Sequence, residues 1–239
     1  MVPDPEASFF THCEQIGVVP DAEQLVLLKK YLDFLYEANA QFNLTAVRDP
    51  ADAWDRHILD SLSLIPFIGN TETLMDVGSG AGLPGVVIAI MRPDIHVTLV
   101  EATGKKAVFL AGAAAELGFD SERFKVMQAR SEDLCNDPEY RETIDVVTAR
   151  GVGVLRALIE YTLPLLRWEG CLLAMKGARG AQEVLDARQS TGLLGGQLSQ
   201  VHKALPGIND DACIVEIEKI KPTPERFPRA YGVIKKNPL

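Results

Sequence analysis

Residues 74–85 read LMDVGSGAGLPG, and this glycine-rich stretch constrains the fold more than any other part of the chain. The glycines, from Gly78 on, follow a short apolar run over 73–77, so they predict a tight turn from a strand into a helix. In a doubly wound α/β sheet, the turn after the first strand lies at the ligand crevice, where a glycine lets the backbone approach a ligand. The stretch therefore predicts a ligand site as well as a fold class.

The glycines fit two motifs with different chemistry. Gly80 to Gly85 fits G-x-G-x-x-G of dinucleotide-binding turns, whereas Asp76 to Gly82 fits D-x-G-x-G-x-G. A carboxylate at Asp76 would repel a pyrophosphate but attract the ammonium and sulfonium groups of S-adenosylmethionine. Glu101 ends the next predicted strand, where an acid can accept hydrogen bonds from the ribose of either ligand. These residues favour the methyl donor, with a dinucleotide or a purely structural turn as alternatives.

The periodicity of the sequence changes near residue 70. Apolar residues share one helical face over 21–42, after a possible capping box of Asp21 and Gln24, and a second helix is predicted from Asp49 to about Ser63. Apolar β-branched runs then alternate with helical segments such as 105–117, the pattern of a parallel sheet with crossover helices. The predicted strands cover 73–77, 95–100, 124–127, 144–148 and 171–175, and a last strand over 212–220 suits antiparallel pairing with the strand before it.

The predicted fold is therefore α/β: a doubly wound, Rossmann-like sheet, mostly parallel with an antiparallel C-terminal strand. We expect a helical N-terminal extension over 1–70, a ligand-binding domain over 71–220 and a basic tail over 221–239. The longest uninterrupted apolar run, 86–91, is far below the roughly 20 residues of a membrane span, and the N-terminus has acids and prolines instead of a secretory signal. We expect a cytoplasmic protein.

Charge is distributed unevenly along the chain. The net charge is −9, yet residues 219–239 contain six basic residues and one acid. This contrast predicts an anionic contact surface at the C-terminus, with a solvated tail as the alternative. The four cysteines are scattered and lack metal-site spacing, so we expect buried thiols and no metal.

Several motifs, taken together, resemble one family. They are DVGSGAGLPG (76–85), GKKAVFL (104–110), QARSEDL (128–134), TARG (148–151), FNLTAVRDP (42–50), RHILDSL (56–62), AMKG (174–177) and FPRAYGVIKKNPL (227–239). In this combination the chain resembles the bacterial small-subunit ribosomal RNA methyltransferase G family, also called glucose-inhibited division protein B. The resemblance covers nearly the whole chain. It implies a class I methyltransferase that uses S-adenosylmethionine to methylate N7 of one guanine, position 527 of 16S ribosomal RNA, in free RNA or in the small ribosomal subunit.

The resemblance also implies roles for single residues. Cofactor contacts carry over to Gly78, Leu83, Ser131, Glu132 and Arg150, beside Asp76, Gly80 and Glu101 from the turn pattern. Arg150, Asn43 and Lys176 are the candidates for a catalytic role, with a salt bridge to a helix as the alternative for Arg150 and a capping role for Asn43 and Thr45. Two departures stand out: Glu101-Ala102 replaces the usual Asp-Ser, and Pro228-Arg229-Ala230 lacks the second cation of P-R-R or P-R-K.

The implied reaction needs little from the protein. Guanine N7 has an unprotonated lone pair at neutral pH, so its attack on a methyl group requires no general base, and alignment can supply up to about 7–11 kcal/mol. The sequence has Ala149-Arg150-Gly151 instead of the N/D-P-P-Y/F motif of exocyclic-amine enzymes, and no cysteine beside a base. An oxidoreductase and a non-catalytic ribosome-binding module are the alternatives.

Phosphate contacts are expected where cations gather, because the rest of the chain is acidic. The candidates are Arg48 and Arg56 in the N-terminal helices and Arg226, Arg229, Lys235 and Lys236 near the C-terminus. These cations would flank the methyl donor if the N-terminal helices fold over the carboxyl edge of the sheet.

Overall fold

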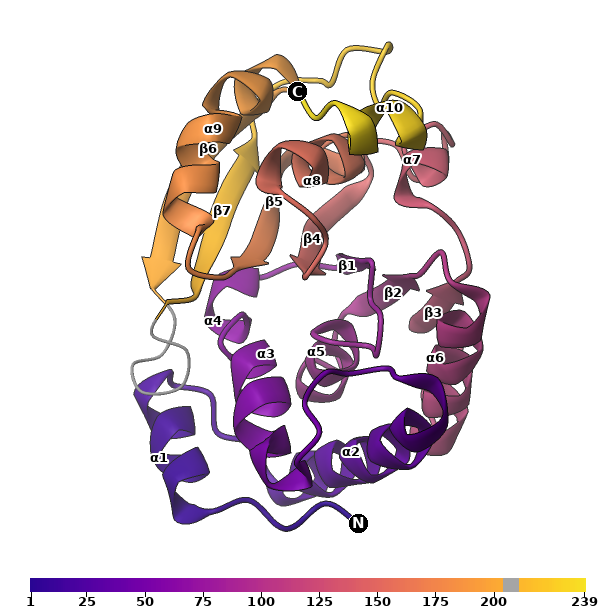
Figure 1. The fold of residues 1–239 in the computed structure, drawn as a ribbon, viewed down its shortest axis with the longest axis vertical. Coiled ribbons are helices and arrows are strands. Elements are labelled where there is room, and N and C mark those ends of the chain that lie inside the picture. The colour runs from indigo at the N-terminus through magenta and orange to yellow at the C-terminus, as the bar shows by residue number, and fades with distance from the viewer. Residues whose placement is uncertain (204–210) are drawn as a thin grey trace.

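The computed structural model describes residues 1–203 and 211–239, and within them seven strands form one sheet in the order β3-β2-β1-β4-β5-β7-β6 (Figure 1). The strands are β1 Thr73–Val77, β2 His96–Val100, β3 Phe124–Met127, β4 Ile144–Arg150, β5 Leu166–Lys176, β6 Gly196–Lys203 and β7 Cys213–Lys219. Strands β1 to β5 pair in parallel, and β7 pairs antiparallel with both β5 and β6. The predicted sheet, including its antiparallel C-terminal strand, is confirmed.

The observed helices agree in part with those predicted from the sequence. They are α1 Ala7–Gln15, α2 Ala22–Phe42, η1 Pro50–Asp52, η2 Trp54–Leu59, α3 Asp60–Leu62, α4 Ile65–Ile68, α5 Gly85–Met91, α6 Gly104–Leu117, α7 Ser131–Leu134, α8 Leu155–Thr162, α9 Gly180–Leu193 and α10 Tyr231–Lys236. The capping box is confirmed, since Asp21 Oδ1 accepts from Gln24 N at 2.8 Å and Gln24 Oε1 accepts from Asp21 N at 2.9 Å. The second predicted helix is divided into a 3₁₀ turn, a π-helical segment (η2) and an α turn.

Strand β6 has no counterpart among the predicted strands. It lies at the edge of the sheet, and most of its side chains are exposed, so the apolar alternation that reveals a half-buried strand is missing. Its pairing with β7 decides its conformation, because the backbone of β7 supplies the hydrogen-bond partners.

Two apolar cores cover the two faces of the sheet. Neighbouring residues of β1 belong to different cores: Leu74 packs with the helices α1 to α6, whereas Met75 packs with α7, α8 and α9. This alternation follows from the pleat of a strand, which sends successive side chains to opposite faces. The N-terminal helices thus share a core with the sheet, and Figure 1 shows α2 lying alongside α6.

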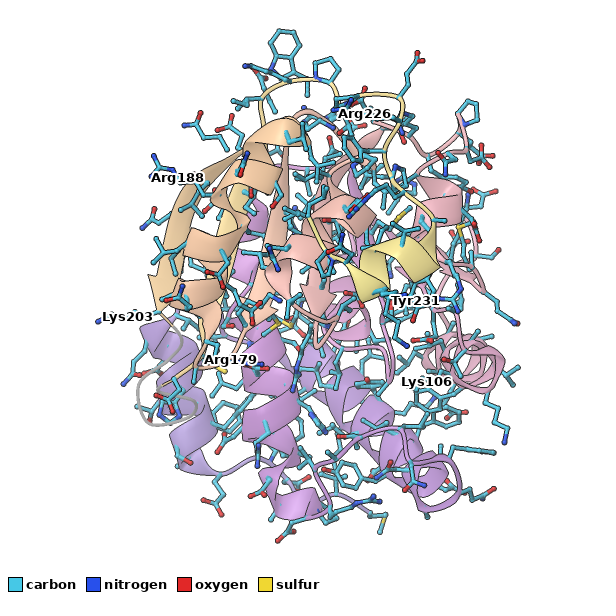
Figure 2. All side chains as sticks on the ribbon, turned by 45° about the horizontal axis from the view of Figure 1, so that its top comes forward. Lys106, Arg179, Arg188, Lys203, Arg226 and Tyr231 are labelled. Carbon is cyan, nitrogen blue, oxygen red and sulfur yellow. The ribbon has the colours of Figure 1, made fainter. Side chains whose placement is uncertain are left out.

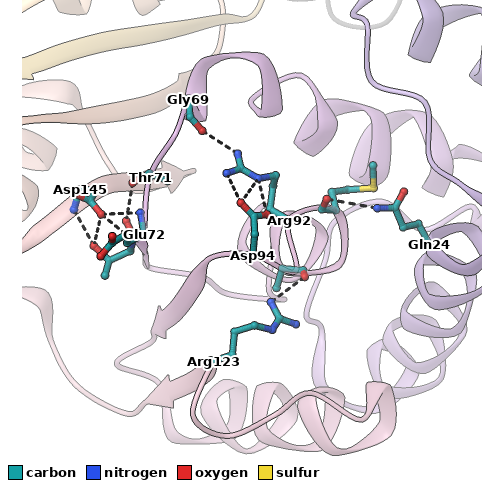
Figure 3. A network of polar contacts seen from close by, with 11 residues as sticks. Gln24, Gly69, Thr71, Glu72, Arg92, Asp94, Arg123 and Asp145 are labelled. Carbon is teal, nitrogen blue, oxygen red and sulfur yellow. Dashed lines mark hydrogen bonds and ion pairs between the residues drawn. The ribbon is translucent and has the colours of Figure 1, made fainter.

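Polar contacts close the amino ends of the strands (Figure 3). Asp145 Oδ2 accepts from the amides of Thr73 at 2.8 Å and Glu72 at 3.0 Å, and these bonds join the starts of β1 and β4. Arg92 pairs with Asp94 at 2.7 Å and donates to the Gly69 carbonyl at 3.0 Å. The glycine turn follows the carboxyl end of β1, so it lies at the opposite edge of the sheet.

Three further properties concern the residues that the structure describes. None of their helices is long and apolar enough to cross a membrane, and no group of three or more His, Cys, Asp and Glu side chains among them could hold a metal ion. The four cysteines are free thiols there, and burial raises the pKa of Cys13 and of Cys171 to about 12. These thiols are therefore protonated and poorly nucleophilic at neutral pH.

Candidate functional site

The turn between β1 and α5 contains three glycines in the left-handed region. Their φ angles are +72° at Gly78, +59° at Gly80 and +95° at Gly82, values that L side chains rarely adopt. A Cβ atom on Gly78 would lie 2.5 Å from Val152 Cγ2, so this glycine also allows a close approach of the loop after β4. The positive angles follow the spacing of D-x-G-x-G-x-G, the register favoured from the sequence.

Gly85 and Asp76 connect this turn to the sheet. A Cβ on Gly85 would lie 2.2 Å from Leu99 Cδ2, so glycine is needed for close packing of α5 on β2. Asp76 is fully buried, and its carboxylate accepts from the Thr148 hydroxyl at 2.8 Å and the Gly85 amide at 3.3 Å. Burial raises the pKa of Asp76 to about 6. The side chain ties β1 to β4 and to α5 and lies beneath the turn, and a direct cofactor contact stays a prediction.

Glu101 fixes the other side of the turn. Its carboxylate is 6% exposed, with Oε2 accepting from the Gly80 amide at 2.9 Å and Oε1 from the Thr103 amide at 2.7 Å. A carboxylate oxygen has two lone pairs, so capacity for another donor is left. The ribose contact inferred from the sequence stays a prediction that this geometry permits.

A cavity of about 110 Å³ lies beside the turn at the carboxyl ends of β1, β2 and β3, and we call it the Tyr231 cavity. Its wall consists of Val77, Gly78, Val100, Ala102, Ala129, Arg130, Ser131, Glu132, Val152, Tyr161 and Tyr231. Glu132 is 7% exposed, and its Oε1 has no hydrogen-bond partner among the described residues. A buried carboxylate oxygen without a partner is costly, and a ligand that donates a hydrogen bond would relieve that cost.

A second cavity of about 510 Å³ lies at the ends of β4 and β5, and we call it the Lys176 cavity. Its wall consists of Asp60, Ser63, Arg150, Gly151, Gly153, Val154, Met175, Lys176, Gly177, Arg179, Glu183, Ala212, Cys213 and Ile214. Lys176 is 8% exposed; its Nζ donates to the Gly153 carbonyl at 2.8 Å and pairs with Glu183 Oε2 at 2.9 Å. Figure 2 labels one residue from the wall of each cavity: Arg179 from the Lys176 cavity and Tyr231 from the Tyr231 cavity.

Arg150 joins the end of β4 to the N-terminal helices. Its Nη2 donates to the Arg56 carbonyl at 2.9 Å, and its Nη1 lies 3.1 Å from Asp60 Oδ2. The salt bridge to a helix, foreseen as the alternative for Arg150, is therefore present. Nη1 is nevertheless a buried nitrogen without a hydrogen bond of proper geometry among the described residues. Burial raises the pKa of Asp60, and the charge of Arg150 opposes that shift.

The loop 151–153 separates the two cavities. Val152 belongs to the wall of the Tyr231 cavity, whereas Gly151 and Gly153 belong to the wall of the Lys176 cavity. One short loop after β4 thus contributes to the walls of both cavities.

The comparisons with known proteins agree with this geometry. The family model GidB, rRNA small subunit methyltransferase G, matches residues 24–210. The chain belongs to this family. It is 40% identical over 228 residues to "Ribosomal RNA small subunit methyltransferase G" of Pelotomaculum thermopropionicum, covering 94% of this chain and 95% of that one. The protein of the same name from Roseiflexus castenholzii is 42% identical over 225 residues, covering 93% and 95%.

Solved structures support the fold. An O-methyltransferase from Bacillus cereus, solved with S-adenosylhomocysteine, has a TM-score of 0.58 at 14% identity, covering 89% of this chain and 97% of that one. The chain is accordingly a methyltransferase with S-adenosylmethionine as its methyl donor, as the sequence predicted. This assignment decides against the oxidoreductase and against the non-catalytic module.

The predicted RNA-binding cations of this family member lie in different environments. Arg48, Arg56, Arg226, Lys235 and Lys236 are exposed. Arg229 is half-buried and pairs with Glu160 at 2.7 Å. The C-terminal segment packs against the rest of the protein, since Phe227 is 4% exposed and Ile234 is fully buried. RNA contacts of these cations stay predictions.

The N-terminal candidates have local partners. Asn43 ends α2 with φ +50°, and its Oδ1 accepts from Arg48 Nη2 at 3.1 Å. The Thr45 hydroxyl oxygen accepts from the Val47 amide at 3.1 Å, so the capping role expected for Thr45 is observed. Thr45 Oγ1 also lies 3.0 Å from Nε2 of buried His57.

Sequence reasoning missed three groups that shape this site. The Tyr31 hydroxyl donates to the Ala81 carbonyl at 2.7 Å and ties α2 to the glycine turn. Glu183, on α9, accepts from the Leu155 amide at 2.7 Å besides pairing with Lys176. Tyr231 lies in the wall of the cavity beside the turn. Two of them had a sequence signal, since Tyr31 lies on the apolar face of α2 and Tyr231 lies within the motif FPRAYGVIKKNPL.

Proposed function

We propose that the chain transfers a methyl group from S-adenosylmethionine to N7 of a single guanine, position 527 of 16S ribosomal RNA, in the cytoplasm. The observation that carries the proposal is the loop 151–153 with a cavity on either side. The Tyr231 cavity would belong to the methyl donor and the Lys176 cavity to the acceptor base. Membership of the rRNA small subunit methyltransferase G family supports ribosomal RNA as the acceptor.

The cofactor would supply a methyl group made electrophilic by its sulfonium. The residues that fit it are Glu132, with an unpartnered carboxylate oxygen, and Glu101, with lone pairs to spare beside the turn. Adenine amines and ribose hydroxyls are hydrogen-bond donors, so these two buried acids match the cofactor chemically. The glycines let the backbone come close to it.

The Lys176 cavity is suited to positioning rather than to proton abstraction. Its two carboxylates are engaged with cations, Asp60 with Arg150 and Glu183 with Lys176. A general base needs a carboxylate free to reach a proton of the substrate. Guanine N7 has no proton to lose, so a cavity of paired charges is sufficient for this acceptor.

Arg150 is the candidate for orienting the base. The residue lines the cavity, and its buried Nη1, 3.1 Å from Asp60 Oδ2, has no hydrogen bond of proper geometry among the described residues. Guanine presents two acceptors on one edge, O6 and N7, and arginine donates readily to such an edge. One hydrogen bond from Arg150 to O6 would fix the base while N7 stays free for attack, and alignment of this kind can lower a barrier by several kcal/mol, with about 7–11 kcal/mol as an upper range.

The test uses an RNA substrate with and without the accepting atom. A small subunit reconstituted with 7-deazaguanine at the target position lacks N7 but keeps the Watson–Crick edge. We expect methyl transfer from labelled S-adenosylmethionine to unmodified subunits and none to the 7-deaza subunits. Transfer to the 7-deaza RNA would overturn the choice of N7 while leaving the methyltransferase assignment intact.

A second measurement addresses the role of Arg150. We expect Arg150→Lys to lower kcat by more than tenfold, because lysine retains the charge but not the fork of donors. Binding of S-adenosylhomocysteine should change little if the acceptor base is its partner. A loss of cofactor affinity with unchanged kcat would place Arg150 at the cofactor instead.

A further inference from the structure

The C-terminal helix α10 is anchored beside the Tyr231 cavity. Arg229, just before α10, makes an ion pair with fully buried Glu160 of α8, and Ile234 inserts into a small apolar cluster with Ala157 and Tyr161. Figure 1 shows α10 next to α8. Two contacts besides those of Tyr231 therefore hold α10, and the Tyr231 ring also packs against this apolar cluster.

Tyr231, the first residue of α10, has two cations and a second aromatic ring near its own ring, and the more distant cation is Lys235, whose Nζ lies 5.7 Å from the ring centre. The Arg130 guanidinium carbon lies 3.9 Å from the centre of the Tyr231 ring, and the Tyr161 ring centre is 6.4 Å away at an interplanar angle of 29°. A guanidinium this close to a ring face is favourable, so Arg130 restrains the orientation of Tyr231. The ring is only half-buried although it has these neighbours.

The wall of the Tyr231 cavity also contains a buried acid with an unsatisfied hydrogen-bond acceptor. Glu132 lines the same cavity, is more than nine-tenths buried, and has a carboxylate oxygen without a hydrogen bond among the described residues. Gly78, of the glycine turn, lines it as well. An aromatic ring, an unpartnered acceptor and a glycine backbone around one cavity fit a planar ligand that carries an amine.

We propose that Tyr231 is a cofactor-binding residue: its ring forms the outer wall for the adenine of the methyl donor, and Arg130 holds the ring in place. Adenine has a π face that stacks on aromatic side chains, and an exocyclic amine that can donate to Glu132. The residues assigned to the cofactor from the sequence lie on strands, on the glycine turn and at the start of α7, whereas Tyr231 reaches the cavity from near the end of the chain. The inference rests on the cofactor, not on which base accepts the methyl group.

Calorimetric titration of the full chain with S-adenosylhomocysteine tests the proposal without methyl transfer. We expect Tyr231→Ala to weaken binding roughly tenfold, because it removes a stacking partner. Tyr231→Phe retains the ring and should bind within about twofold of the unmodified chain. Val233→Ala, at an exposed position of the same helix, is the matched control and should have no effect.

A second ligand shows which part of the cofactor Tyr231 contacts. 5′-Methylthioadenosine keeps the adenine and lacks the amino-acid end, so Tyr231→Ala should weaken it by about the same factor as S-adenosylhomocysteine. Arg130→Gln, which releases the ring without touching the core, should weaken both ligands by roughly two- to fivefold.

The outcomes are distinct. If Tyr231→Ala and Arg130→Gln are folded and bind both ligands with unchanged affinity, the proposal is overturned. Loss confined to S-adenosylhomocysteine would place Tyr231 at the amino-acid end and overturn the adenine assignment. If Tyr231→Ala does not fold, Tyr231→Leu, which keeps an apolar side chain but has no π face, takes its place with both ligands. Absence of binding by the unmodified chain would instead contradict the cofactor site itself.

Discussion

Arg229 holds the carboxylate of Glu160 through two side-chain hydrogen bonds, from Nε to Oε1 at 2.8 Å and from Nη2 to Oε2 at 2.7 Å. Glu160 is fully buried in α8, so this bidentate pair fastens the C-terminal segment to that helix. An arginine predicted from its charge to contact RNA thus has a structural partner as well.

Removal of Arg229 should destabilise the protein. We expect Arg229→Ala to lower the free energy of unfolding by about 3–5 kcal/mol, because it leaves a buried carboxylate without its cation. Urea denaturation measures this change, with exposed Arg226→Ala as a control that should alter stability by less than about 0.5 kcal/mol. The double variant Arg229→Met/Glu160→Met should recover part of the loss; a larger loss than in the single variant would contradict the explanation.

Side chains added at different glycines of the turn should lower the affinity for the cofactor by different amounts. Gly78→Ala should weaken S-adenosylhomocysteine binding by more than about tenfold, because its Cβ would meet Val152 at 2.5 Å and push the loop 151–153. Gly80→Ala, also at positive φ, would have only the Gly78 carbonyl at 3.8 Å and should cost less affinity. Equal affinities of the two variants, measured by calorimetry, would show that the contact with Val152 has no importance.

Asp76 should make the folded state less stable as pH rises. Its pKa is raised from 3.8 to about 6, so between these values the folded state binds more protons than the unfolded chain. Stability therefore falls across this window, by about 3 kcal/mol for a shift of roughly two units. Asp76→Asn should remove this decline, whatever its absolute stability, in urea midpoints measured from pH 4 to 7. An unchanged pH profile would mean that Asp76 is charged throughout.

His57 should act in the opposite direction. Burial and the nearby charge of Arg150 lower the pKa of His57 from 6.5 to about 4, so the unfolded chain binds more protons over this range. Stability from this group is present above pH 6.5 and is lost as pH falls toward 4. His57→Gln should make the slope of the unfolding free energy against pH less positive between about pH 4 and 6.5, whereas Asp76→Asn should make it more positive. The same urea series measures both, and slopes that change together would contradict this assignment.

The exposed cations near the C-terminus should govern the salt dependence of RNA binding. Replacing Arg226, Lys235 and Lys236 together by glutamine should flatten the slope of log K against log salt by about two units, since each phosphate contact contributes roughly 0.7–0.9. Cofactor affinity should stay within about threefold, a difference below 1 kcal/mol. An unchanged slope with full methylation would locate the RNA surface elsewhere.

Local patterns in the sequence were sufficient for the elements that depend on near neighbours. The capping box of Asp21 and Gln24, the strand before the glycine turn and the antiparallel β7 could all be predicted, because periodicity and capping act within a few residues. The spacing of Asp76, Gly78, Gly80 and Gly82 indicated the right cofactor. The structure adds that Asp76 lies buried under the turn and accepts hydrogen bonds from Thr148 and Gly85.

The sequence by itself therefore determined the fold class, the glycine turn and, through combined motifs, the family. Only the tertiary structure decided which distant residues meet: Arg150 with Asp60, Lys176 with Glu183, Arg229 with Glu160, and Arg130 with Tyr231. Strand β6 also formed by pairing rather than by its own pattern. The physical reason is that a local pattern fixes backbone conformation and burial, whereas the partner of a charge or a ring depends on where separate elements pack.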